Sequence, residues 1–219
     1  MPVRTPIASE LDFVRMASDL GLSFPSRKVV LFHGTSRVNG EKILSDGFRV
    51  SSSNWGARSN QGLVFFSRSY APWYCLGFVE DDAVDDVVAL VKVEVDVDDL
   101  YPEDDFVMFS LGIPKYSQRD IDIVDFERIK SGWMRSLKYL GNVSAKPDKV
   151  KVLGVTFFSA TDLISKFDPV ITPVNYSIMG DYYCDLSNWI FDGKSIHDFP
   201  VFMESERDEL IKLMREDKK

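Results

Sequence analysis

Two features that the sequence lacks narrow the classes of protein to which this chain can belong. It has only two cysteines, Cys75 and Cys184, among 219 residues, which is too few for a disulfide framework and offers no metal-ligand spacing. Its first residues, MPVRTPIASELDF, do not show the charged region and long apolar run that are typical of a signal peptide, and no later apolar run is long enough to cross a bilayer. We therefore expect a cytoplasmic protein with no metal centre and no membrane contact.

An excess of positive charge is lacking as well, because the formal net charge is -8 at pH 7. Indiscriminate binding to nucleic acid depends on clustered Lys and Arg, so the total charge disfavours it. A basic stretch from Arg128 to Lys151 contrasts with an acidic stretch from Glu80 to Asp105. We interpret the two stretches as solvated faces of opposite sign rather than as a nucleic-acid groove.

Apolar runs bounded by turn residues predict an alternation of strands and helices. Strands are expected where β-branched and aromatic residues follow one another, at residues 28–32, 63–66, 87–97 and 150–158. Helices are expected from capping residues and apolar periodicity, at residues 9–20, 39–46, 126–140, 161–167 and 206–216. Residues 168–200 are expected to form loops rich in aromatic residues. No repeat or linker interrupts the chain, which favours one α+β domain.

One motif, His33-Gly34-Thr35, follows the first apolar run directly. A glycine there lets a flat amide approach the backbone, so that the N–H and C=O of Gly34 can pair with a carboxamide such as that of nicotinamide. The imidazole of His33 can hydrogen-bond a ribose hydroxyl, and Thr35 adds a hydroxyl. The motif is therefore compatible with a nicotinamide nucleotide site.

This motif lies in LFHGTSRVNGEKILSDGF and is followed, after an intervening loop, by GLVFFSRSYAPWYC. The two segments together resemble the ADP-ribosyltransferase superfamily, and most closely its diphtheria-toxin-like and poly-ADP-ribose-polymerase-like branch. The resemblance implies a single α+β domain with a split, mixed β-sheet, flanking helices and NAD in the cleft between the two halves. Residues 1–165 would form this NAD-binding domain, and residues 166–219 would add aromatic loops and a helix packed on it.

The resemblance also implies roles for individual residues. His33, Gly34 and Thr35 would bind NAD, and His33 and Phe65 would belong to the catalytic set. Phe65 stands where the family usually has a tyrosine beside the nicotinamide, so it would stack on the ring without supplying a hydroxyl. Further cofactor contacts are expected from Ser67, Tyr70 and Tyr74. The alternative, that Phe65 and Phe66 are simply core residues of a strand, stays open.

A carboxylate is expected beside the ribose, because cleavage of the nicotinamide–ribose bond passes through an oxocarbenium-like state. Asp120, in Gln118-Arg119-Asp120, is the candidate for this third catalytic residue. Four other acids remain possible, namely Asp122, Asp125, Glu127 and Asp148. Each of them also fits an ordinary place at a helix N-terminus.

The expected activity is transfer of ADP-ribose from NAD to a protein, RNA or DNA acceptor, as in a toxin or effector, with an antitoxin or target protein as a partner. The loop Ser51–Gly62, rich in Ser, Asn and Gly, is expected to act as a flap over the site. Two alternatives are an inactive NAD-binding or interaction module of the same fold, and an NAD-dependent RNA 2′-phosphotransferase.

Overall fold

The computed structural model of the chain describes residues 27–49, 62–78, 86–102, 132–134, 136–137, 140–167 and 176–200, with side chains from residue 184 onward in the last range. Several predictions fall outside these ranges. They are the helices at 9–20 and 206–216, most of the flap and Asp120.

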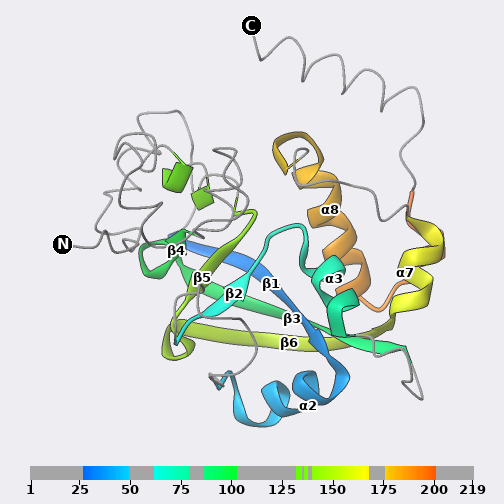
Figure 1. Cartoon of the computed structure of the whole chain (residues 1–219), viewed down its shortest axis with the longest axis horizontal. Helices are drawn as coiled ribbons and strands as arrows, with labels where there is room; N and C mark the ends of the chain where they lie inside the picture. The colour runs from blue at the N-terminus through cyan, green and yellow to red at the C-terminus, as the bar shows by residue number, and fades with distance from the viewer. Residues whose placement is uncertain are drawn as a thin grey trace, which may run out of the picture.

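The described strands form two three-stranded antiparallel sheets (Figure 1). Sheet A has the order β1-β3-β6, with bounds Lys28–Ser36, Val87–Asp96 and Val150–Ser159. Sheet B has the order β2-β5-β4, with bounds Val64–Phe66, Val143–Ala145 and Tyr101–Pro102. A single bridge between Phe32 and Ser67 joins β1 to the segment that follows β2. Together with the helices, this architecture is compatible with the predicted α+β class.

The prediction of a mixed sheet is wrong for the described strands, because every pair among them is antiparallel. A parallel pair needs a connection that returns the chain to the end of the sheet at which it started. Here β3 begins opposite the end of β1, with Val88 beside Ser36. The chain therefore runs back along β1 in the opposite direction.

Four α-helices have assigned bounds, at Arg37–Asp46 for α2, Ala71–Tyr74 for α3, Ala160–Lys166 for α7 and Tyr176–Phe191 for α8. Short 3-10 turns follow α3 at Cys75–Phe78 and occur at Val97–Asp99, Pro147–Lys149 and Ile196–Asp198. The side chain of Ser36 caps α2, so the helix begins two residues before its predicted start at residue 39. Gly47 ends it with a positive φ of 74°, directly after the predicted last residue.

The prediction of loops throughout residues 168–200 is wrong for α8. This segment contains Tyr, Ser, Asn and Gly, which are weak helix formers. Its helical state depends on tertiary packing, because Leu186 and Ile190 are buried in a cluster with Phe32 and Leu90 of sheet A. Local propensity could not reveal that contact.

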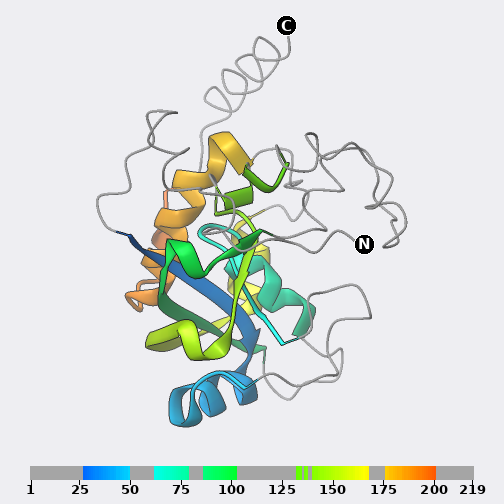
Figure 2. The ribbon, with the colours of Figure 1, turned by 90° about the vertical axis from the view of Figure 1, so that its left-hand side faces the viewer.

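Sheet A has a different set of partners on each face (Figures 1 and 2). On one face α2 and the inner face of sheet B enclose a core that includes Leu31, Ile43 and Phe66. On the other face α3, α7 and α8 pack on Phe32 and Leu90.

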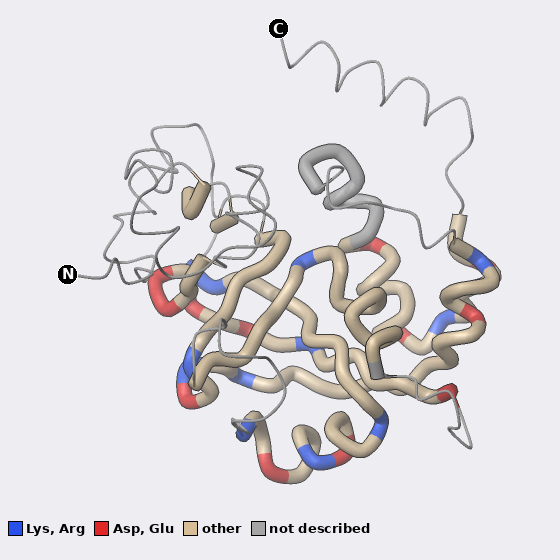
Figure 3. Tube along the Cα trace, in the orientation of Figure 1, with Lys and Arg blue, Asp and Glu red and all other residues tan. Residues whose placement is uncertain are grey.

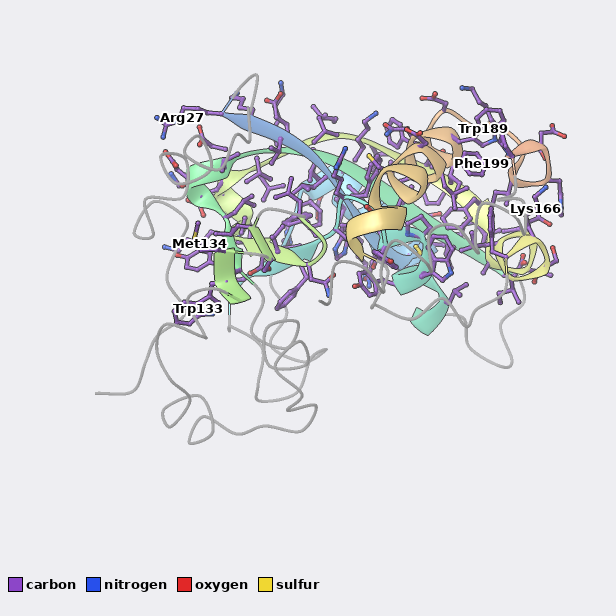
Figure 4. The ribbon with its side chains drawn as sticks, turned by 90° about the horizontal axis from the view of Figure 1, so that it is seen from above. Arg27, Trp133, Met134, Lys166, Trp189 and Phe199 are labelled. Atoms are coloured by element: carbon purple, nitrogen blue, oxygen red, sulfur yellow. The ribbon has the colours of Figure 1, made fainter. Side chains whose placement is uncertain are left out.

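Figure 4 shows Trp189, Phe199 and Lys166 together at the α7–α8 end, far from Arg27 and Met134.

Charged residues of both signs are interspersed along the described surface (Figure 3). At one end of sheet A, Glu94 pairs with Lys28 on β1 and Lys151 on β6. At the other end, Asp86 accepts hydrogen bonds from the Ser159 hydroxyl and the Thr161 amide and so helps to cap α7. In the part of the chain that the structure describes, no helix is long and apolar enough to cross a membrane.

Candidate functional site

The side chain of His33 connects the two sequence motifs. Its Nδ1 lies 2.8 Å from the carbonyl oxygen of Phe65. Because a carbonyl only accepts, Nδ1 must carry the hydrogen and donate it. Burial lowers the pKa of His33 from its ordinary 6.5, although the bond to Phe65 opposes the shift. The imidazole is therefore neutral near pH 7, and its Nε2 presents a lone pair that can accept a hydrogen bond.

Aromatic rings fix the orientation of this imidazole. The His33 ring meets Phe48 edge-on at a centroid distance of 5.2 Å and Phe66 at 6.0 Å, and the two phenylalanines meet each other at 5.5 Å. His33 lies inside β1, which continues to Ser36, and not just beyond the strand as the sequence predicts. Because the strand continues past His33, pairing with Val91 of β3 fixes the backbone of the histidine.

The two sheets separate next to Gly34. Phe32 and Ser67 exchange two backbone hydrogen bonds of 2.9 Å each. Backbone groups alternate in direction along a strand, so the N–H and C=O of Gly34 face the same way as those of Phe32. Beyond the bridge β2 pairs with β5 instead, and among the described residues no backbone bond joins Gly34 to β2. Gly34 therefore presents a donor and an acceptor to the split between the sheets.

The absence of a side chain at Gly34 also has a packing reason that the sequence did not reveal. A Cβ built on this residue would lie 2.1 Å from the carbonyl oxygen of Ala71 and 2.8 Å from the sulfur of Cys75. The first turn of α3 thus lies directly on the strand. Glycine is required here by the fold, whether or not a ligand binds.

Phe65 and Phe66 point to opposite faces of β2 and have different surroundings. Phe66 is 2% exposed and belongs to the core between the sheets. Phe65 is half-buried and stands opposite Ser144 of β5. The alternative that both residues belong to the core is therefore confirmed for Phe66, while Phe65 is only half-buried.

Three other residues expected to contact NAD are buried. Thr35 and Tyr70 are 3% and 5% exposed, and Ser67 is fully buried. The Ser67 hydroxyl accepts hydrogen bonds from the backbone amides of Ser69 and Tyr70, an arrangement that fixes the turn into α3. Tyr70 packs in the cluster beneath α8. These three buried residues therefore stabilise the fold around the two motifs.

Tyr74 connects α3 to the start of β5. Its hydroxyl donates to the side-chain oxygen of Asn142. The backbone carbonyl of Asn142 accepts a hydrogen bond of 2.7 Å from the Ser136 hydroxyl. The chain turns into this position at Leu140, which has a positive φ of 50°, a conformation that is unfavourable for a branched residue. The Leu140 carbonyl accepts from the amide of Arg68. The start of β5 is thereby held against the second motif.

Several of the described carboxylates occupy structural positions. Asp86 caps α7, Glu94 pairs with lysines across sheet A, and Asp162 contacts His197. Asp148 is exposed in a 3-10 turn before β6. Asp120, Asp122, Asp125 and Glu127 lie outside the described residues, so the third catalytic residue stays a prediction. No cluster of three or more His, Cys, Asp or Glu side chains able to hold a metal occurs within the described ranges.

The structure adds Phe48, Asn142 and Ser144 to the residues expected from the sequence. Phe48 follows the glycine that ends α2, and only the tertiary fold brings its ring to His33. Asn142 precedes a three-residue strand and Ser144 lies within it, and a strand of that length is too short to produce a recognisable pattern.

Comparison of the chain with protein families, with curated proteins and with solved structures gives no match.

Proposed function

We propose that this chain binds NAD at the split between sheets A and B and transfers its ADP-ribose to a protein or nucleic-acid acceptor. The observation that carries the proposal is the hydrogen bond from His33 Nδ1 to the Phe65 carbonyl. It joins the two motifs on which the resemblance to ADP-ribosyltransferases rests. It also leaves Nε2 as an acceptor suited to a ribose hydroxyl.

The open edge of β1 supports the same proposal. The N–H and C=O of Gly34 face the split between the sheets and have no partner on β2 among the described residues. A carboxamide has one carbonyl and one NH₂ group, so it can pair with both backbone groups of one residue. Phe65 is half-buried, and its ring would offer a flat apolar surface for the pyridine ring.

In the proposed reaction, the bond between C1′ of the ribose and the nicotinamide nitrogen breaks, and its electron pair leaves with the ring. A nucleophilic atom of the acceptor forms the new bond to C1′ and loses its proton. Asp120 would stabilise the positive charge that develops on the ribose. His33 would hold the ribose hydroxyl, and Gly34 would orient the leaving carboxamide.

One observation favours a second candidate, a module that binds NAD without transferring ADP-ribose. The residue opposite Phe65 on β5 is Ser144, which cannot supply the negative charge that the reaction needs. Under this alternative the chain would bind NAD with an affinity similar to that of a transferase, and the nicotinamide–ribose bond would remain intact.

NAD binding is tested by calorimetric titration of the wild type and of His33→Ala. The chain contains only two histidines, and His197 is exposed and paired with Asp162, so His197→Ala is the matched control. We expect His33→Ala to weaken NAD binding about tenfold or more, because a hydrogen bond and a supporting ring are lost. His197→Ala should bind as the wild type does. Equal affinity in all three proteins would refute the proposed site.

A further inference from the structure

Strand β6 forms an outer edge of sheet A with which no described residue pairs. It comes last in the order β1-β3-β6 and has β3 on its inner side (Figure 1). The opposite edge differs, because Phe32 of β1 is bridged there to Ser67. A free edge strand presents unpaired N–H and C=O groups to which another strand can bind. β6 is therefore the strand of sheet A that offers such an edge.

The strand register shows which backbone groups face this edge. Phe32 exchanges its backbone hydrogen bonds with the segment after β2, so the backbone groups of Lys92, opposite Phe32 on β3, face β6. Lys92 stands opposite Gly154 of β6. Because the direction alternates along a strand, the groups of Val155 and Phe157 face outward. Neither residue has a backbone partner on that side among the described residues.

The second half of β6 lacks the charges and prolines that usually keep edge strands from pairing. Residues 154–159 read GVTFFS, and the register shift in the β3–β6 pair lies before them, at Leu153. The side chains of Leu153 and Phe157 are 42% and 40% exposed. Covering apolar surface of this kind is favourable. This half of the strand is therefore regular, uncharged and suited to pairing with another strand.

We propose that the partner is a second copy of this chain, bound β6 against β6 in antiparallel orientation. The two three-stranded sheets A would then join into one continuous sheet. With the twofold axis at Thr156, Val155 of each copy stands opposite Phe157 of the other, and the outward backbone groups of both residues find partners. The contact uses the same surface on both copies, so it closes into a dimer.

The charges at the two ends of β6 favour a second copy over an unrelated strand. At the start of the strand, the Lys151 side chain is 70% exposed and lies 4.0 Å from Glu94. The end of the strand lies beside Asp86, and a hydrogen bond from the Ser159 hydroxyl is the main cause that lowers the pKa of this carboxyl to about 2. Antiparallel self-pairing brings the lysine end of each copy to the aspartate end of the other. The dimer contains this attraction twice.

Three substitutions on the edge and one control test the dimer. Val155→Pro removes an outward N–H that forms no bond within sheet A, a position at which edge strands tolerate proline. Phe157→Lys places a charge in the contact, and Lys151→Glu reverses the charge at the end of the contact. Val30→Lys is the matched control, because Val30 is 43% exposed on the same sheet but belongs to β1.

Sedimentation velocity of the full chain, from about 1 μM to about 100 μM, measures the association. We expect the wild type and Val30→Lys to dimerise, and Val155→Pro and Phe157→Lys to remain monomeric with the circular dichroism spectrum of the wild type. Lys151→Glu should raise the dissociation constant of the dimer about fivefold.

Amide hydrogen exchange locates the contact. The amides of Val155 and Phe157 should be protected only at concentrations at which the dimer forms. The amide of Thr156 faces β3 and should be protected at every concentration.

A wild type that stays monomeric over the whole range overturns the inference. A dimer that persists in Val155→Pro and Phe157→Lys overturns it too, as does one in which the amides of Val155 and Phe157 exchange as fast as in the monomer. If either variant fails to fold, the exchange rates and Lys151→Glu decide. The inference does not depend on NAD, so a failure of the proposed function leaves it standing.

Discussion

Gly34→Ala tests whether the backbone of β1 is packed as tightly on α3 as the structure indicates. The new Cβ would lie 2.1 Å from the Ala71 carbonyl oxygen and 3.0 Å from the Cys75 amide nitrogen. Ordinary contacts between heavy atoms require about 3.5 Å or more, so strand and helix must move apart by more than about 1 Å. Ala71 and Cys75 are fully buried, so the movement disturbs packed neighbours.

Overpacking a well-filled core lowers the free energy of unfolding by about 1–3 kcal/mol. Because this clash involves backbone atoms, which cannot change rotamer, we expect a value near the upper end. For a chain of this size that corresponds to a fall in melting temperature of roughly 6–12 °C.

Thermal unfolding followed by circular dichroism measures this effect, with Gly77→Ala as the control. A Cβ at Gly77 would meet nothing within 4 Å, so its melting temperature should stay close to that of the wild type. If Gly34→Ala unfolds at the wild-type temperature, the packing argument fails. If that variant also loses NAD affinity, Gly34 serves the ligand rather than the fold.

Two further predictions concern the chemistry of the site. Because His33 has a lowered pKa, NAD affinity should stay constant as the pH falls to 6.5 and decline only below that pH. An affinity already halved at pH 6.5 would contradict the role of neutral His33 as a hydrogen-bond acceptor. As the pH falls from 6.5 to the lowered pKa of His33, the free energy of unfolding should also fall, because the histidine binds a proton in the unfolded chain before it does so in the folded protein. His33→Gln should abolish this dependence. Asp120→Asn should reduce turnover by orders of magnitude and change NAD affinity by only a few-fold, as measured by nicotinamide release and titration. Full activity in this variant would exclude Asp120 as the stabilising carboxylate.

The longer strands could be predicted from sequence because their signals are local. β1, β3 and β6 are apolar runs rich in β-branched residues. The structure places β3 and β6 within one residue of their predicted bounds, whereas β1 continues four residues past its predicted end, to Ser36. The end of α2 could also be predicted, because the single residue Gly47 terminates it, whereas its start after Ser36 lies two residues before the predicted one.

The elements that complete the site could not be predicted, because their signals are not local. β4 and β5 contain two and three residues. The pairing of β5 with β2 and of β4 with β5, rather than a sequence pattern, makes them strands. The partly open surroundings of Phe65 depend on this pairing. Gly34 illustrates a related difficulty. A glycine at this position can be explained by a ligand that approaches the backbone or by a helix that packs on the strand. Only the position of Ala71 in the structure reveals the packing of the helix.

The most direct test of the account is to incubate the wild-type chain with NAD labelled in its adenylate part, together with lysate protein, total RNA or DNA. We expect label to appear in one class of macromolecule with an equal amount of free nicotinamide, and His33→Ala to produce neither. Wild-type protein that binds NAD but releases no nicotinamide and labels no acceptor would contradict ADP-ribosyl transfer and leave the binding module as the function of this fold.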